Sequence, residues 1–318
     1  MEYKTLGKTG LKISKVGFGA WAIGGNMWGP QDDSDSITAL NKAIDLGVNF
    51  IDTAAAYGNG HSEKIIGQVL KKRKEKIYIA TKIPPLMWPP PPNTHAKDAF
   101  PKDSIISSVE QSLKNLGIDC IDLIQLHSWR ENWTEDTDWY ETLLDLKKNG
   151  KIRFIGVSVH DNLEDESLGL IETGRVDTIQ VVYNVLAQTP QKNLFPKALK
   201  YNVGIIARVP LAYGALTGKF TKDTRFAEND FRAGKYSGNA LDNVVKKVEM
   251  YKKIIGTSDK QTLISYAIHF ASNHPAVSTT IPGIRNTKQA EENCNVFNSK
   301  IDPVILEKLN QFIVEKSH

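Results

Sequence analysis

Four side chains with acid–base character stand at or just past the ends of three apolar runs. Asp52 lies in the run NFIDTA, and Tyr57 follows it by five residues. Lys82 ends the run IYIATK, and His127 ends the run IDLIQLH. A fold that closes parallel strands around one axis would bring all of these ends onto one rim. A phenol, an ammonium, a carboxylate and an imidazole would then meet there over a carbonyl group, which predicts an enzyme that donates a proton during C=O reduction.

Each of the four side chains has a separate role in this interpretation. A tyrosine with a pKa of about 10 is a poor acid near neutral pH, and an ammonium beside Tyr57 would lower that pKa by favouring the phenolate. Lys82 would supply the ammonium, and Asp52 would hold Lys82 through a charge-assisted hydrogen bond. His127 would orient the substrate oxygen or share the proton. Taken singly, each residue has a simpler interpretation: Asp52 could cap a helix, Lys82 could be an exposed lysine and His127 could bond only to the backbone. Their occurrence together at three consecutive strand ends favours the catalytic interpretation.

The elements that must position these residues alternate along the chain. A short hairpin over residues 3–14 precedes eight units in which a strand-like run leads into a stretch of helical spacing. The expected strands are VGFGAW, NFIDTA, IYIATK, IDLIQLH, IRFIGVSV, TIQVVYN, VGIIARVP and VSTTIPG. The expected helices are 34–46, 62–73, 103–116, 134–148, 163–172, 194–201, 241–255, 261–273, 287–296 and a last one at 303–314.

Eight such units predict an α/β fold, a single (β/α)8 TIM barrel over residues 1–318, with an N-terminal β-hairpin and a C-terminal extra helix. The competing architecture is an open, doubly wound sheet, which places a glycine fingerprint directly after the first strand. Trp21 stands where the third glycine of that fingerprint is required. The closed barrel is therefore the predicted fold.

The composition is that of an ordinary globular protein. Hydrophobic residues make up 41% and charged residues 24% of the chain, with 40 basic against 36 acidic side chains. The basic runs at 71–74 and 246–247 lack an aromatic platform for bases, so no nucleic-acid partner is expected. No run approaches about 18 apolar residues and no apolar signal core opens the chain, so no membrane partner is expected. Together with only two cysteines, these features predict a cytoplasmic location.

Two segments are longer than a compact connection requires. Residues 84–101 contain PPLMWPPPP, a stiff stretch of the polyproline type that carries Trp88, and residues 216–239 contain several aromatic side chains. Both follow strands, so both are expected on the rim where the four side chains meet. The proline-rich segment also fits a rigid spacer.

Several segments of the chain resemble the aldo-keto reductase superfamily. They are GFGAWAIGG, FIDTAAAYGNGHSE, IATK, GIDCIDLIQLH, KIRFIGVS, IQVVYN, LTGKF and IPGIRNTKQAEEN. The match runs in register from about Leu6 to Asn293, and the WAIGGNMWG opening is similar to bacterial and fungal members that resemble potassium-channel β subunits. The resemblance implies that the four residues named above are a catalytic tetrad with Tyr57 as the general acid.

The resemblance also implies a nicotinamide cofactor at the centre of the barrel. Ser158 and Gln180 match the positions that hold the nicotinamide amide, although Val159 stands where the family often has asparagine. Arg208 stands where an aromatic side chain commonly stacks on the nicotinamide, and the glycines of residues 210–219 would permit close approach to the pyrophosphate. The residues expected to bind the cofactor are Gly19, Trp21, Asp52, Ser158, Gln180, Arg208, Pro210, Leu211, Gly214, Leu216, Lys219, Gly283, Arg285, Gln289 and Asn293.

Arg285, Gln289 and Asn293 are four residues apart and so share one helical face. In relatives this face holds the adenine and the adenosine 2′-phosphate, and Arg285 offers two parallel hydrogen bonds to a phosphate. The cofactor is therefore predicted to be NADP(H) rather than NAD(H). The alternative, an exposed arginine at a helix N-terminus, is opposed by the helix dipole.

Aromatic and imidazole side chains are expected to line the substrate pocket. These are Trp21, Tyr57, Trp88 and His127, with Trp129 as a further candidate, whereas Trp28 and Trp133 are assigned to packing. His160 and Asp161 follow a strand and fit either the rim or a turn cap. The seven histidines show no ligand spacing with cysteine or carboxylates, so no metal site is predicted. Serine-hydrolase and phosphate-loop motifs are absent.

The predicted function is NADP(H)-dependent reduction of an aldehyde or ketone, with a small-molecule carbonyl substrate as the partner. The sequence does not select that substrate, because variable loops build the pocket. Two alternatives remain: an alcohol or sugar dehydrogenase that uses the same site in reverse, and a redox-sensing regulatory protein like the channel β subunits. Nothing in the sequence decides the oligomeric state, and a monomer is the default.

Overall fold

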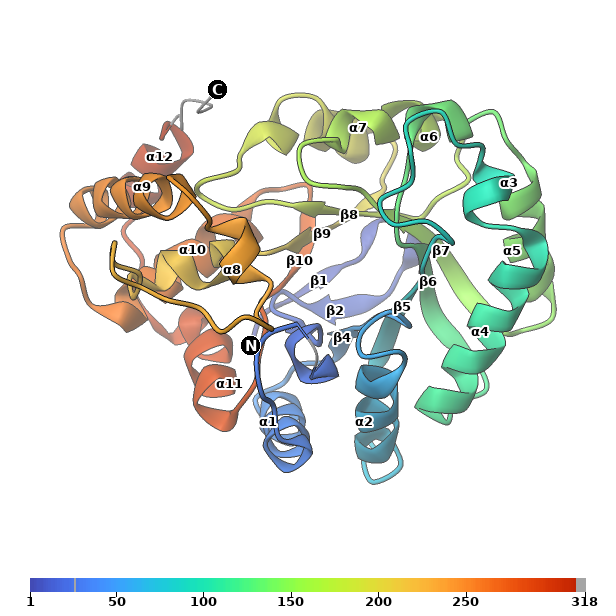
Figure 1. The fold of residues 1–318 in the computed structure, drawn as a ribbon, viewed down its shortest axis with the longest axis horizontal. Helices are drawn as coiled ribbons and strands as arrows, with labels where there is room; N and C mark the ends of the chain where they lie inside the picture. The colour runs from blue at the N-terminus through green and yellow to red at the C-terminus, as the bar shows by residue number, and fades with distance from the viewer. Residues whose placement is uncertain (26, 313–318) are drawn as a thin grey trace.

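Eight parallel strands form the centre of the molecule (Figure 1). The computed structural model describes residues 1–25 and 27–312. Each strand pairs with the next along the chain, and parallel bridges from Val16 to Thr280 and from Gly19 to Gly283 join the first strand to the last. The strands are β3 (Phe18–Gly19), β4 (Phe50–Asp52), β5 (Tyr78–Ile83), β6 (Ile121–Leu126), β7 (Ile152–Ser158), β8 (Thr178–Val182), β9 (Gly204–Arg208) and β10 (Val277–Ile281). The predicted (β/α)8 barrel is confirmed.

Helices surround these strands and alternate with them along the chain (Figure 1). The helices that complete the eight units are α1 (Asp33–Asp45), α2 (His61–Leu70), α4 (Lys102–Leu116), α5 (Asp138–Lys148), α6 (Leu168–Glu172), α7 (Leu194–Lys200), α10 (Lys260–Asn273) and α11 (Thr287–Cys294). Additional helices are α3 (Ala96–Ala99), α8 (Arg232–Lys235), α9 (Ala240–Ile255) and α12 (Pro303–Asn310). Within the described residues, no helix has the length and apolar character needed to cross a membrane.

Four helices differ from their predicted ranges by three residues or more. The helix α2 ends at Leu70 rather than at residue 73, and α6 begins at Leu168 rather than at residue 163, because a 3-10 helix occupies Glu164–Ser167. The helix predicted from residue 134 begins at Asp138, because tertiary contacts hold the preceding residues outside it. The carbonyl oxygen of Thr134 accepts a hydrogen bond from Arg175 at 2.6 Å, and the Asp136 carboxylate accepts one from the Ala96 backbone N–H at 2.9 Å. The last helix ends at Asn310 rather than 314, and residues 313–314 of that prediction lie outside the described residues.

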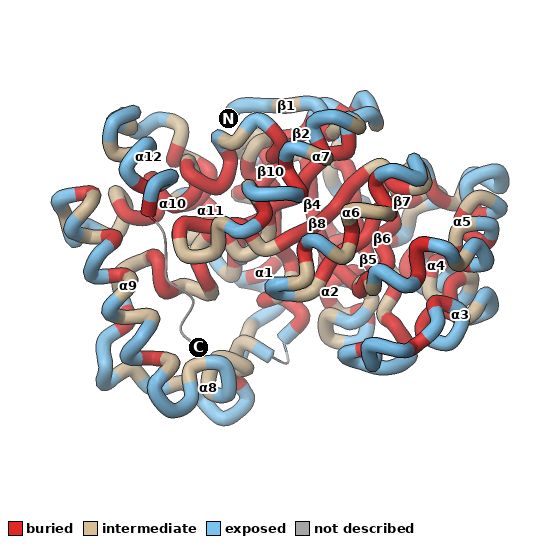
Figure 2. The backbone as a smooth tube through the Cα atoms, turned by 90° about the horizontal axis from the view of Figure 1, so that it is seen from above, coloured by how far each residue is buried: buried red, intermediate tan, exposed pale blue. Residues whose placement is uncertain are grey.

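An antiparallel hairpin covers the N-terminal end of the barrel, as predicted. Its strands are β1 (Tyr3–Thr5) and β2 (Lys12–Ser14), and Figure 2 shows it at the opposite end of the molecule from α8. A side chain at Gly7, whose φ is +46°, would come within 2.3 Å of the Gly204 backbone nitrogen, so only glycine fits there. The hairpin packs on the starts of the strands through a second apolar cluster: Leu6, Leu11, Ile13, Phe50, Tyr78, Ala80, Leu123, Ile206 and Ile281. The C-terminal ends of the strands are left to form a site.

Candidate active site

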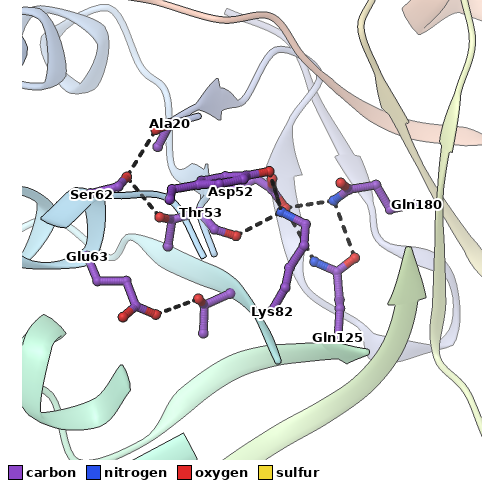
Figure 3. A network of polar contacts seen from close by, with 10 residues as sticks. Ala20, Asp52, Thr53, Ser62, Glu63, Lys82, Gln125 and Gln180 are labelled. Carbon is purple, nitrogen blue, oxygen red and sulfur yellow. Dashed lines mark hydrogen bonds and ion pairs between the residues drawn. The ribbon is translucent and has the colours of Figure 1, made fainter. Parts of the chain in front are cut away.

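The four side chains singled out from the sequence meet at the C-terminal ends of β4, β5 and β6. Asp52 ends β4, Lys82 lies one residue before the end of β5, and His127 directly follows β6. Tyr57 belongs to the turn between β4 and α2. The Lys82 Nζ atom donates a hydrogen bond to Asp52 Oδ1 at 2.5 Å (Figure 3) and another to the Tyr57 hydroxyl oxygen at 3.4 Å. The Tyr57 and His127 rings lie 5.8 Å apart between centroids.

Lys82 is fully buried, with 0% of its surface exposed, so its charge requires partners. Besides Asp52, the ammonium donates to the Thr53 carbonyl oxygen at 2.8 Å. The second Asp52 oxygen accepts hydrogen bonds from Gln180 at 2.7 Å and Gln125 at 3.3 Å, which fixes the carboxylate (Figure 3). Burial is the largest single influence and opposes the ammonium form, but Asp52 and Tyr57 together more than offset it and raise the pKa of Lys82. Lys82 therefore remains charged at neutral pH.

The pKa of Tyr57 is raised, which corrects the prediction that Lys82 would lower it. Burial is the largest cause, because it removes the water that would stabilise a phenolate. The Lys82 ammonium acts in the predicted direction, but the Asp52 carboxylate partly cancels its field. The phenol therefore keeps its proton at neutral pH, and the Lys82 ammonium lies within hydrogen-bond distance of the Tyr57 oxygen.

His127 is a neutral imidazole at neutral pH. Burial, followed by the charges of Lys82 and Arg208, holds its pKa well below the ordinary value. Its Nδ1 atom is buried and has no hydrogen-bond partner among the described residues. A neutral ring has one nitrogen that donates and one that accepts, so His127 can orient a carbonyl oxygen beside the Tyr57 hydroxyl.

A cavity of about 620 Å³ opens above these side chains. Of the residues predicted to bind cofactor or substrate, those that line it are Gly19, Trp21, Asp52, Tyr57, Trp88, His127, Ser158, Gln180, Arg208, Pro210, Leu211, Gly214, Lys219, Gly283, Arg285, Gln289 and Asn293. Lys82 lies beneath its floor. Leu216 also lies outside the lining, because its side chain is buried in the hydrophobic core.

Residues from three neighbouring strands form one wall of this cavity. Ser158 and Gln180 are paired in register between β7 and β8, and Arg208 ends β9. The Arg208 guanidinium donates to the Val159 carbonyl oxygen at 2.9 Å and to the Asp161 carboxylate at 2.8 Å. Val159 therefore contributes a backbone oxygen where the resemblance suggested an asparagine side chain, and that oxygen helps to fix the guanidinium.

The segment after β9 has an unusual backbone. Val209, Ala212 and Tyr213 have φ values of 61°, 47° and 56°, in a region that residues with side chains rarely adopt. Each such residue costs on the order of 1–3 kcal/mol unless its surroundings hold it in place. The Tyr213 hydroxyl donates a hydrogen bond to Asp161 at 3.0 Å, which is one such constraint. Alternating backbone conformations of this kind expose N–H groups and suit an anionic group.

Arg285 has contacts that the sequence did not predict. Its guanidinium donates hydrogen bonds to the Trp28 carbonyl oxygen at 3.0 Å, to the Gln31 side chain at 2.7 Å and to the Pro30 carbonyl oxygen. The Gln289 side-chain oxygen accepts from the Arg285 backbone N–H at 2.9 Å. Arg285 therefore links residues 28–31 to the connection between β10 and α11 through hydrogen bonds, and it also lines the cavity.

Residues 15–313 match the model of the Aldo/keto reductase family. The chain belongs to this family. It is 32% identical to the aldo-keto reductase YhdN of Bacillus subtilis, over 92% of this chain and 87% of that protein. It is 30% identical to a probable voltage-gated potassium channel subunit beta of Arabidopsis thaliana, over 99% of this chain and 98% of that protein. Among solved structures, the glycerol dehydrogenase AKR11B4 from Gluconobacter oxydans is similar, with a TM-score of 0.78 and 28% identity over 98% of this chain and 94% of that one.

Two tryptophans of this aldo-keto reductase are placed differently from the prediction, whereas Trp21 and Trp88 line the cavity and Trp133 is buried in the core as expected. Trp28 lines the cavity, whereas Trp129 is fully buried and packs edge-on against Trp133 and Trp139. The prediction exchanged the roles of Trp28 and Trp129. The reason is tertiary, because Arg285 holds the segment that begins at Trp28 beside the cavity, and no local pattern shows this contact.

The cavity wall also includes residues that sequence reasoning did not assign. They come mainly from the long connection after β9 and from α10 and α11: Met27, Tyr213, Thr217, Arg232, Lys260, Ile264 and Glu292. Two sequence signals bear on them: the predicted pyrophosphate loop at residues 210–219, which contains Tyr213 and Thr217, and the length and aromatic content of residues 216–239, which contain Arg232. No pattern in the sequence singled out the other four. From residues 216–239, Phe231 packs on Trp21 and on Trp28, with ring centroids 4.7 Å apart in both cases.

Proposed function

We propose that this aldo-keto reductase reduces a small aldehyde or ketone with NADP(H), with Tyr57 as the general acid. The observation that carries the proposal is the fully buried Lys82 ammonium, which joins Asp52 to the Tyr57 hydroxyl at the floor of the cavity. A buried charge of this kind is expensive to maintain for structure alone. The cavity, at about 620 Å³, is within the range of cofactor and substrate sites.

The bound cofactor supplies the hydride in this proposal, and the protein supplies the proton and the positioning. The Tyr57 O–H group donates its proton to the carbonyl oxygen as negative charge develops there. The Lys82 Nζ atom, 3.4 Å from the Tyr57 oxygen, stabilises the resulting phenolate. The Asp52 carboxylate, whose Oδ1 atom lies 2.5 Å from Nζ, keeps Lys82 charged. His127 holds the carbonyl oxygen in line with Tyr57 through a hydrogen bond from its neutral ring.

The wall formed by Ser158, Gln180 and Arg208 fits a nicotinamide. The Gln180 amide nitrogen donates to Asp52 at 2.7 Å, so the amide oxygen is left to accept a hydrogen bond from the nicotinamide carboxamide. Neither that oxygen nor the Ser158 hydroxyl has a hydrogen bond within the described part of the chain, and both residues line the cavity. The Arg208 guanidinium offers a planar surface on which the ring can stack.

A cluster of cations supports NADP(H) rather than NAD(H). Lys219, Lys260 and Arg285 all line the cavity, and Lys260 is paired with Glu292. Burial is the largest cause that lowers the pKa of Lys219; repulsion from the neighbouring Lys260 charge lowers it further, and Glu292 partly opposes that repulsion. A 2′-phosphate would relieve this repulsion. Arg285 contributes fewer free N–H groups than the sequence suggested, because it already binds residues 28–31.

The test is oxidation of the reduced cofactor, followed at 340 nm, with a panel of small aldehydes and ketones and with NADPH and NADH in parallel. Tyr57→Phe removes only the proposed acid, and Tyr140→Phe is a matched control outside the cavity lining. Turnover is expected in the wild type and in Tyr140→Phe, with a loss of at least about 100-fold in Tyr57→Phe. Equal rates in the wild type and in Tyr57→Phe would refute the assignment of the acid.

The likeness to the Arabidopsis channel subunit favours a second candidate, a regulatory protein that binds cofactor and reports redox state. Such a protein would retain its cofactor through purification and dilution, and would show little turnover with any carbonyl compound. The glycerol dehydrogenase neighbour favours operation in the oxidative direction. Rates measured in both directions on one substrate–product pair separate these candidates, since only the regulatory protein is slow in both.

A further inference from the structure

His160 is a second imidazole on the cavity wall that the proposed mechanism does not use. It lies two residues beyond the end of β7 and lines the same cavity as Tyr57 and His127. Its Nε2 atom is buried and has no hydrogen-bond partner among the described residues. An unpaired polar group in a protein wall costs free energy that a bound ligand can recover.

The Trp88 indole separates this imidazole from His127. Its ring centroid lies 4.9 Å from that of His127 and 5.2 Å from that of His160. A substrate whose carbonyl oxygen reaches Tyr57 and His127 therefore passes Trp88 before it meets His160. The geometry provides two polar points with an aromatic surface between them.

The charges around His160 are already paired. Arg208 binds Asp161 at 2.8 Å, and Arg130 approaches Glu166 at 3.4 Å. Burial, followed by the Arg130 and Arg208 charges, lowers the pKa of His160, so its ring is neutral at neutral pH. A neutral imidazole has one donor and one acceptor, which matches a hydroxyl group, since a hydroxyl also donates and accepts. A carboxylate only accepts hydrogen bonds, so it could pair with the donor nitrogen of the neutral ring but not with the acceptor nitrogen.

We propose that His160 binds a hydroxyl group of the substrate, and that the preferred substrates are hydroxyaldehydes or hydroxyketones rather than plain alkyl carbonyl compounds. This inference deepens the proposed function and rests on it. The carbonyl oxygen lies at Tyr57 and His127, the carbon chain crosses Trp88, and the hydroxyl group reaches the ring of His160.

The test compares glyceraldehyde with 2-methylbutanal, in which methyl groups replace both hydroxyls. His160→Phe keeps a ring of similar size without nitrogen, and His160→Gln restores one donor and one acceptor. His95→Phe is the matched control, because His95 is exposed and its side chain makes no hydrogen bond to any residue that the structure describes. In His160→Phe, kcat/KM for glyceraldehyde should fall about tenfold, mainly through KM, while that for 2-methylbutanal stays within about twofold. His160→Gln should recover most of the loss.

If His160→Phe lowers kcat/KM equally for glyceraldehyde and for 2-methylbutanal, the inference is overturned, because an equal loss would indicate a structural role for the ring. Succinic semialdehyde, which carries a carboxylate, is tested alongside the two aldehydes. If His160→Phe lowers kcat/KM for this substrate alone, the inference is overturned in favour of carboxylate binding. The histidine ring signals of the 15N-labelled protein, titrated with glycerol and with 2-methylbutanol, give a readout that is independent of turnover. If the wild type reduces neither aldehyde, the proposed function fails. A shift of the His160 signals with glycerol alone would then still support hydroxyl binding, and no shift would overturn it.

Discussion

Replacing Asp52 by asparagine removes the carboxylate that neutralises the buried Lys82 ammonium. Lys82 has no exposed surface, and its remaining partners are the neutral Thr53 carbonyl oxygen at 2.8 Å and the Tyr57 hydroxyl at 3.4 Å. Removing one member of a buried ion pair costs about 3–5 kcal/mol, because the other charge stays in the interior. With an unfolding entropy of roughly 0.7 kcal/mol/K for a chain of this length, Tm should fall by roughly 4–8 °C.

The double variant Asp52→Asn/Lys82→Met isolates the interaction. Removing both charges leaves no unpaired ion, so the double variant should be more stable than Asp52→Asn alone by at least about 2 kcal/mol. Lys82→Met alone should be the milder single change. In that variant the Asp52 carboxylate keeps the hydrogen bonds from Gln180 and Gln125, at 2.7 and 3.3 Å. Urea unfolding followed by tryptophan fluorescence measures all four proteins of the cycle.

Asp45→Asn is the control for this cycle. Asp45 pairs with Arg73 at 2.7 Å, but its side chain is 57% exposed, so its loss should cost less than about 1 kcal/mol. The reasoning is refuted if Asp52→Asn costs no more than this control. It is also refuted if the two single losses simply add in the double variant, because additivity would mean that the two charges do not stabilise each other.

Three further predictions follow from the site and the fold. The raised pKa of Tyr57 and the lowered pKa of His127 leave both groups uncharged at neutral pH, so kcat for reduction should be flat between about pH 7 and 9. A decline centred near pH 7.5 in the pH–rate profile would contradict this. Lys219→Ala should lower kcat/KM for NADPH by about tenfold and leave that for NADH within about twofold, and equal losses would argue against phosphate binding. Gly67→Ala should destabilise the fold by about 1–3 kcal/mol in urea, because its Cβ would lie 2.7 Å from two backbone oxygens at the end of α4. Gly234→Ala, whose added Cβ would meet none of the described residues within 4 Å, should be neutral or slightly stabilising. Equal effects of the two substitutions on the free energy of unfolding would refute the argument.

The fold and the positions of the four acid–base residues could be predicted because they depend on local patterns. Buried parallel strands appear as continuous apolar runs, and the residues at their C-terminal ends must share one rim once the strands close. Asp52, Lys82 and His127 each end or follow such a run. The helical spacing of the intervening segments then supplied the outer ring, with errors mainly at helix ends.

The features that could not be predicted depend on contacts between distant segments. The direction of the Tyr57 pKa shift is a balance between burial and two nearby charges, and the sequence shows only that the charges are present. The exchange of Trp28 and Trp129 follows from the hydrogen bonds of Arg285 to residues 28–31. The late start of α5 follows from the Arg175 contact to the carbonyl group of residue 134. None of these partners is near its counterpart in sequence.

A single-turnover measurement tests the central claim, that Tyr57 donates the proton, most directly. Enzyme loaded with NADPH is mixed with excess aldehyde in a stopped-flow instrument, and hydride transfer is followed by loss of cofactor absorbance in the wild type and in Tyr57→Phe. The proposed mechanism predicts a fall of about 10²- to 10⁴-fold in this rate, with the Kd for NADPH within about twofold of the wild-type value. A Tyr57→Phe rate within tenfold of the wild type, at unchanged cofactor affinity, would contradict it.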